Sequence, residues 1–200
     1  LRSMFSQRTT TALLHGLEDP DNRSAWVELD ARCRPVMLGV ARRIGLTESE
    51  AEDAVQATMV CFVEAYRGGQ YQRERGRLSA FLITILRSRA IDARRRAVAR
   101  REAAAPIEAV ERFSELEVSR IWLDERRSQL LRQAMSELRE GGADERMLAA
   151  FELFGVRGVA IGEVSERLGM SREEVYNAKY RVTRRLQPVV ARLDELYEDL

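Results

Sequence analysis

The sequence predicts an all-α protein built from two helical domains joined by a linker. Apolar residues recur at helical spacing along most of the chain, and no segment alternates apolar and polar residues as a half-buried strand does. Glycine- and proline-containing breaks divide the periodic stretches into helices of ordinary length, and no internal repeat appears. The composition also changes after Arg101, where alanines, a proline and a weakly patterned acidic stretch read as a linker. We therefore expect domains at residues 1–102 and 118–200, with the linker at 103–117.

The first domain is expected to contain four helices. A short one covers 9–17, and Asp19 to Asn22 breaks it so that the next can start at Ser24. That second helix carries an apolar stripe to Ile44 and should kink at Pro35, because proline removes a backbone donor. The third follows Thr47–Glu50, a capping-box spacing, and stops at Gly68–Gly69. A polar loop at 70–76 leads into the fourth.

The fourth helix, 77–101, changes character along its length. Its first half places five apolar residues at i, i+3, i+4, i+7 and i+8: Leu78, Phe81, Leu82, Ile85 and Leu86. Its second half is basic, with seven arginines and Asp92 as its one acid: Arg87, Arg89, Arg94, Arg95, Arg96, Arg100 and Arg101. The apolar half can pack against the rest of the domain while the cationic half stays in water. Such a helix can bind the phosphate backbone of a nucleic acid, since each neutralised phosphate releases a counterion.

The second domain is expected to end in a helix-turn-helix. Helical blocks run from near Val118 to Gly141–Gly142 and from Asp144 to Phe154. Two helices joined by a tight turn at Gly169–Met170 follow, and Ser171–Glu174 has capping-box spacing. The last helix has a clean inner stripe and is expected to be interrupted at Pro188. Its polar outer face can read base edges or hold phosphates.

Charge and composition exclude several classes of protein. The net charge is only +1, from 33 basic and 32 acidic residues, so basic charge must be segregated if nucleic acid is the partner. Cys33 and Cys61 are expected to be buried free thiols, and with His15 alone we expect no metal site and no cofactor. No apolar run approaches the ~20 residues of a membrane span and no signal-peptide core appears, so we expect a cytoplasmic protein.

Three motifs in the expected order resemble those of RNA polymerase sigma factors of the extracytoplasmic-function (ECF) type. Residues 50–56, Glu-Ala-Glu-Asp-Ala-Val-Gln, resemble the family's acidic segment that docks on the clamp helices of the polymerase's largest subunit. Residues 81–92 resemble its promoter-melting helix, and residues 158–186 resemble its reader of the upstream promoter element. The resemblance implies a non-enzymatic subunit that binds core RNA polymerase, recognises a bipartite promoter and helps to open it. An anti-sigma factor is a further partner that the resemblance allows.

The resemblance assigns three sets of residues. Glu52, Asp53 and Gln56 would contact polymerase. Promoter DNA, as melted non-template single strand, would meet Tyr71, Arg73, Arg77, Arg87, Ser88, Arg94 and Arg95. Duplex DNA would meet the helix-turn-helix residues Ser171, Arg172, Tyr176, Asn177, Lys179, Arg181 and Arg184. Tyr71 has an alternative interpretation of equal weight, as a half-buried loop aromatic.

Two departures from the family pattern bear on specificity. Ser88 and Phe81 stand where the family has Asn and Trp, and serine can pair with an exposed base edge at one point where asparagine pairs at two. The segment Glu173 to Lys179 also departs from the usual sequence of the recognition helix, which leaves the upstream sequence preference open.

Three rival functions differ in what they leave unexplained. A stand-alone helix-turn-helix regulator would not need the acidic segment or the basic helix. An enzyme would need a nucleophile–base pair, a metal cluster or a glycine-rich phosphate loop, and the sequence offers none of these. A helical interaction protein could retain the fold without binding DNA.

Overall fold

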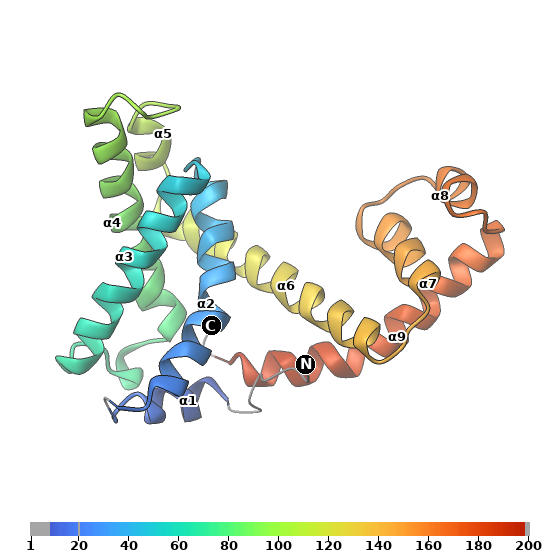
Figure 1. The fold of residues 1–200 in the computed structure, drawn as a ribbon, viewed down its shortest axis with the longest axis horizontal. Coiled ribbons are helices and arrows are strands. Elements are labelled where there is room, and N and C mark those ends of the chain that lie inside the picture. Colours follow the sequence, from blue (N-terminus) through green and yellow to red (C-terminus); the bar gives the residue numbers. More distant parts are fainter. Residues whose placement is uncertain (1–8, 20, 199–200) are drawn as a thin grey trace. The chain divides into compact units, whose positions relative to one another are not determined.

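The computed structural model describes residues 9–19 and 21–198, and all regular secondary structure in this part of the chain is helical (Figure 1). The predicted all-α class is therefore confirmed. Pro20, in the break predicted after the first helix, lies outside the described residues. The described chain divides into two compact units, an N-terminal unit of residues 9–129 and 196–198 and a C-terminal unit, Leu130–Glu195.

The N-terminal unit begins with α1 (Thr10–Gly16) and α2 (Arg23–Arg43). The Thr9 hydroxyl caps α1 by accepting from the Ala12 N–H at 3.2 Å, and the Asn22 side chain caps α2 in the same way. The start predicted at Ser24 is thus one residue late, because Asn22 rather than Ser24 supplies the cap. Helix α2 continues through Pro35, and its apolar side is buried on both sides of that residue.

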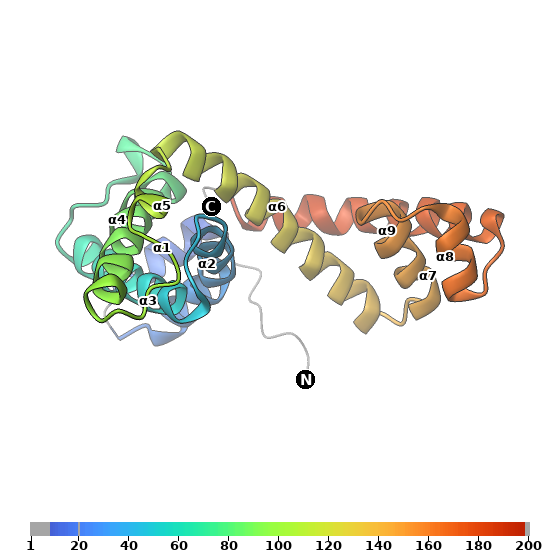
Figure 2. The same cartoon turned by 90° about the horizontal axis from the view of Figure 1, so that it is seen from above.

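Helices α3 (Glu48–Arg67) and α4 (Leu78–Ala99) pack along one another, and both views show them side by side (Figures 1 and 2). The predicted capping box is present at the start of α3, where the Thr47 and Glu50 side chains bond each other's backbone N–H groups. The loop between the two helices holds one turn of 3₁₀ helix, η1 (Arg73–Arg75). The apolar half of α4 is buried as expected, with Leu78, Leu82 and Leu86 fully enclosed.

The linker predicted at 103–117 is ordered. It contains the short helix α5 (Glu108–Glu111), which contacts α4, and the first residues of α6 (Glu115–Glu140). Trp122 on α6 is almost completely buried, and the helix ends before Gly141–Gly142 as predicted. Helix α6 itself crosses the boundary between the two units at Gln129 and Leu130.

The C-terminal unit contains α7 (Glu145–Ala150), a π-helical continuation η2 (Phe151–Val156), α8 (Ile161–Leu168) and most of α9 (Arg172–Leu196). Its core joins Ala150, Val164, Val175 and Ala178 from three helices. Gly169 ends α8 with a φ of +58°, a left-handed conformation that glycine adopts at little cost.

The predicted interruption at Pro188 is wrong, because α9 continues through it to Leu196. Proline removes one hydrogen bond from a helix. Leu186 and Leu193, buried on either side of Pro188, keep the same face of α9 packed and hold the two segments in one helix.

Both predicted free cysteines are reduced thiols in the structure. Cys33 is buried in α2 and Cys61 is partly buried in α3. Burial raises the pKa of the Cys33 thiol well above its ordinary value, so the group stays protonated and unreactive at neutral pH.

Candidate nucleic-acid interface

Helix α3 presents a polar face to solvent opposite its buried stripe. Glu52, Asp53 and Gln56 are exposed there, as their spacing predicts, while Val55 and Met59 face the core. The Glu52 carboxylate accepts from Arg34 at 3.2 Å, so this residue is tied to α2. Val60, 52% exposed one turn after Gln56, extends the face with an apolar side chain. The surface combines one carboxylate, one amide and one apolar group that are open to a partner.

The arginines of α4 do not share one role. Arg94 was expected to contact melted DNA, yet its side chain is completely buried. Its guanidinium lies 3.1 Å from Glu50 and donates to the carbonyl oxygens of Gly45 and Ala105 at 2.5 and 2.8 Å. A buried cation with these internal partners is not open to a nucleic acid, so we reassign Arg94 to a structural role.

Two other arginines of this helix are occupied by the segment that follows it. The Arg87 Nε–H donates to the Phe113 carbonyl at 2.8 Å, and Arg95 pairs with the Glu111 carboxylate at 2.9 Å. Both side chains remain at the surface, Arg87 half-buried and Arg95 exposed. Ser88, on the same helix, is exposed.

Tyr71 is buried, with 9% of its surface exposed. Its ring lies 5.4 Å from that of Phe81 and 6.2 Å, nearly parallel, from that of Tyr66. Phe62 and Trp26 complete this aromatic cluster at the junction of α2, α3 and α4. The ring therefore has a packing role in the unit, and such aromatic pairs are worth about 0.5–1.5 kcal/mol beyond the area they bury.

Tyr71 also contributes to the lining of a hollow of about 390 Å³ within the N-terminal unit. Tyr66 and Tyr71 are its aromatic lining residues, and His15 of α1, Glu18 of the turn after α1 and Arg73 of the loop before α4 also line it. The Tyr66 hydroxyl donates to the Leu14 carbonyl at 2.5 Å, which fixes α1 to α3 beside the hollow. Arg73 lies 3.8 Å from Glu198, and Arg77 is exposed at the start of α4.

In the C-terminal unit the predicted DNA-reading side chains of α9 all lie at the surface: Ser171, Arg172, Tyr176, Asn177, Lys179, Arg181 and Arg184. Some of them also pack locally. The Tyr176 ring meets Phe154 edge-on at 5.3 Å, and the Lys179 ammonium lies 4.9 Å from the centre of the same Phe154 ring. These contacts orient two of the polar side chains on the helix face.

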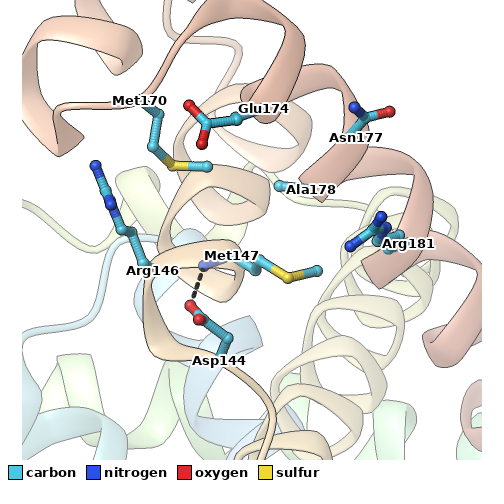
Figure 3. Close-up of a pocket in the computed structure, with 8 residues that line it drawn as sticks. All are labelled: Asp144, Arg146, Met147, Met170, Glu174, Asn177, Ala178 and Arg181. Atoms are coloured by element: carbon cyan, nitrogen blue, oxygen red, sulfur yellow. Dashed lines mark hydrogen bonds between the residues drawn. The ribbon is translucent and has the colours of Figure 1, made fainter.

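A shallow hollow of about 250 Å³ runs along the flank of α9 (Figure 3). Asn177 and Arg181 extend from α9 at one edge, while Arg146 belongs to α7 and Asp144 is the residue before it. Asp144 caps α7 by accepting from the Met147 N–H at 3.0 Å. The hollow therefore lies beside Asn177 and Arg181, two of the side chains that are expected to meet duplex DNA.

The turn between α8 and α9 is held by two sets of hydrogen bonds. Ser171 and Glu174 form the predicted cap, and the bonds from Ser171 lower the pKa of the Glu174 carboxyl below its ordinary value. The Arg146 guanidinium donates to the Leu168 and Gly169 carbonyls at the end of α8. The first turn of α9 is therefore fixed relative to α7 and α8.

The structure adds residues that the sequence did not single out. His15 and Tyr66 flank the hollow beside Tyr71, and Val60 extends the polar face of α3. Only helical periodicity gives a signal for Val60, as an apolar residue off the buried stripe. His15 and Tyr71 are 56 positions apart, and no local pattern brings them together.

Among the described residues no group of three or more His, Cys, Asp or Glu side chains could hold a metal ion. In the same part of the chain, no helix is both long and apolar enough to span a membrane.

Comparisons with known proteins identify the domain that carries the α3 face and α4. Residues 29–100, from within α2 to the residue after α4, match the family model described as sigma-70 region 2. None of the curated proteins compared with the chain matches it. A solved structure, that of CnrH in complex with the cytosolic domain of CnrY, covers 90% of this chain and 95% of that chain at 22% identity, with a TM-score of 0.36. The chain thus carries a sigma-70 region 2 domain at residues 29–100.

Proposed function

We propose that the protein is an ECF-type sigma factor that binds core RNA polymerase, recognises a bipartite promoter and promotes strand opening in the cytoplasm. The observation that carries this proposal is the pairing, in one chain, of a sigma-70 region 2 domain with a separate unit whose last long helix exposes a polar face after a tight turn. Region 2 supplies polymerase docking and single-strand binding, and the second unit supplies duplex recognition.

The exposed face of α3 is the proposed docking surface for the clamp helices of the polymerase's largest subunit. Asp53 and Gln56 lie three residues apart on one exposed side of the helix, so both can meet the same partner. Val60 adds apolar area to that face. Glu52 contributes charge, although its pairing with Arg34 leaves it less available.

The hollow beside Tyr71 is the proposed place for a base of the melted non-template strand. Its aromatic wall can stack on any base, because every base has a π-face. Arg73 and Arg77, near the same loop, can approach the backbone phosphates. Ser88, with Arg87 and Arg95 further along α4, would continue the contact.

The outer face of α9 is the proposed reader of the upstream duplex element. Arg172, Tyr176 and Asn177 lie in its first two turns, where a recognition helix usually meets base edges. Lys179, Arg181 and Arg184 lie further along and suit phosphates. The rival function, a helix-turn-helix regulator that acts without polymerase, gives the α3 face no role.

Co-purification with core polymerase separates these two functions. The variant Asp53→Arg with Gln56→Ala should lose core binding while retaining its helical content, because both side chains are exposed. Glu108→Arg reverses the charge of another exposed acid in the same unit and should still co-purify. Undiminished binding of the double variant would remove the proposed docking surface.

A further inference from the structure

The segment from Ala105 to Phe113, here called the strap, crosses α4 within the N-terminal unit. It includes α5, which lies beside α4 (Figures 1 and 2). The composition of this segment predicts a linker, whereas the structure shows it bonded to three arginines of the basic helix. Two of these arginines, Arg87 and Arg95, are also proposed to contact the melted strand.

The contacts of the strap follow the row of arginines. At its start, the Ala105 carbonyl accepts from Arg94 at 2.8 Å. At its end, the carbonyls of Phe113 and Glu111 accept from Arg87 at 2.8 and 3.5 Å. The Glu111 carboxylate also pairs with Arg95 at 2.9 Å. The strap therefore offers oxygen acceptors to guanidinium donors, as a phosphate backbone does.

Apolar residues hold the strap in place between these polar contacts. Val110 is 1% exposed, and Ile107 and Phe113, three residues before and after it, are half-buried. Glu108 and Glu111 lie on the same short helix but differ in their surroundings. Glu111 meets Arg95, whereas Glu108 is exposed and is not paired with any described arginine.

We propose that the strap is an autoinhibitory cover of the basic side of α4, with Glu111 in the place that a phosphate of single-stranded DNA would take. The proposal rests on the proposed function of α4. Arg87 uses its Nε–H and one Nη–H on carbonyls of the strap, and Arg95 uses one Nη–H on the Glu111 carboxylate, so these donors cannot also bond a strand while the strap is in place. Phosphate oxygens carry charge and form stronger bonds to guanidinium than neutral carbonyls do, so a strand can displace the strap.

The two ends of the strap should respond differently. Arg94 is fully buried and paired with Glu50, so the Ala105 end stays attached. Residues 107–113 depend on one buried valine and on surface contacts, and this part leaves when DNA binds. The strap would therefore swing away from α4 at residues 107–113 while it stays attached at Ala105.

The matched variants Glu111→Gln and Glu108→Gln test this cover. Each removes one negative charge from the same helical turn, but only the first removes a contact with α4. The measurement is fluorescence anisotropy of a labelled oligodeoxythymidine of about 12 nucleotides, within the site sizes of single-strand grooves. We expect Glu111→Gln to bind it about two- to five-fold more tightly than Glu108→Gln, the range that an exposed ion pair is worth.

Two further measurements test whether the effect of Glu111→Gln comes from its contact with Arg95. In an Arg95→Gln background the advantage of Glu111→Gln should disappear, because the carboxylate then has no partner to release. In the wild-type protein, saturating oligonucleotide should speed amide hydrogen exchange in 107–113 and leave Ala105 unchanged.

Equal affinities of Glu111→Gln and Glu108→Gln for the oligonucleotide would contradict the proposed autoinhibitory role of the strap. Unchanged amide hydrogen exchange in residues 107–113 of a protein that binds the oligonucleotide would contradict it as well. So would the absence of strand binding by every variant. Transcription with core polymerase, measured in parallel, distinguishes this failure from failure of the proposed function, because a sigma factor without an autoinhibitory strap still supports promoter-directed synthesis.

Discussion

The Arg94 guanidinium and the Glu50 carboxylate lie 3.1 Å apart inside the N-terminal unit, and both side chains are buried. Glu50 also accepts from the backbone N–H and the hydroxyl of Thr47, at 2.7 and 2.9 Å. Arg94 reaches on to the carbonyls of Gly45 and Ala105. The Glu50–Arg94 pair and its hydrogen bonds thus join the start of α3 and the last third of α4 to the turn before α3 and to the strap.

Replacing Arg94 with methionine should lower the free energy of unfolding by roughly 3–5 kcal/mol, because it leaves a buried carboxylate without its cation. The matched control is Arg96→Met, an exposed arginine on the same helix, which should change stability by about 0.5 kcal/mol or less. Urea denaturation followed by circular dichroism measures both. Equal, small losses would mean that the Glu50–Arg94 pair does not stabilise the unit.

Gly169→Ala should destabilise the helix-turn-helix by about 1–2 kcal/mol, because φ at this position is +58° and L-residues avoid the left-handed region. An added Cβ would also lie 3.3 Å from the Arg146 guanidinium that clamps the turn. Gly162→Ala, on α8, is the control: its Cβ would meet one flexible arginine tip at 3.8 Å, and alanine favours a helix. Thermal melting should separate the two variants in opposite directions. A gain for both would show that the turn tolerates a side chain.

Tyr71→Ala should impair open-complex formation on a duplex promoter more than on a template with a pre-melted bubble. Base stacking worth ~1–3 kcal/mol chiefly opposes re-pairing of the strands, so its loss matters most where the strands must separate. The same change removes a ring from the aromatic cluster, so stability is measured alongside, with Tyr71→Phe as the ring-retaining control. Equal impairment on both templates would assign Tyr71 a structural role alone.

Asn177→Ala and Arg184→Ala should weaken duplex binding in different ways. Loss of a base-reading amide costs roughly 1–3 kcal/mol at its own base pair and relaxes the preference there. Loss of a phosphate-binding arginine weakens all sequences alike and makes the salt dependence shallower by about one unit. A panel of single-base promoter variants, titrated over a salt series, measures both. A uniform loss for Asn177→Ala, or a base-specific loss for Arg184→Ala, would place a different face of α9 on the DNA.

Local patterns predicted the features that depend on residues near in sequence. The capping boxes at Thr47 and Ser171, the glycine turn at Gly169 and the exposed face of Asp53 and Gln56 each follow from spacing within two helical turns. The resemblance of the three motifs predicted the sigma-70 region 2 domain that the family match shows.

Three features that depend on packing between residues far apart in the sequence were not predicted from local patterns. The basic run predicts that Arg94 is one more solvated arginine. The structure buries it because its partners are Glu50, 44 positions earlier, and the carbonyl of Ala105. The composition of the strap predicts a linker because its apolar residues are too few to form a pattern, yet Val110 is buried on α5, the short helix that contacts α4. Pro188 reads as a break, but packing of α9 on either side outweighs one lost hydrogen bond.

Promoter-directed run-off transcription tests whether the protein acts as a sigma factor through the exposed face of α3. Core polymerase is supplied with the purified protein and a library of its own genomic upstream fragments, and the transcripts are mapped. We expect discrete start sites that require the protein, that vanish with Asp53→Arg/Gln56→Ala and that persist with Glu108→Arg. Transcripts that are unchanged by adding the protein, or that the docking variant supports as well as the wild type, would contradict it.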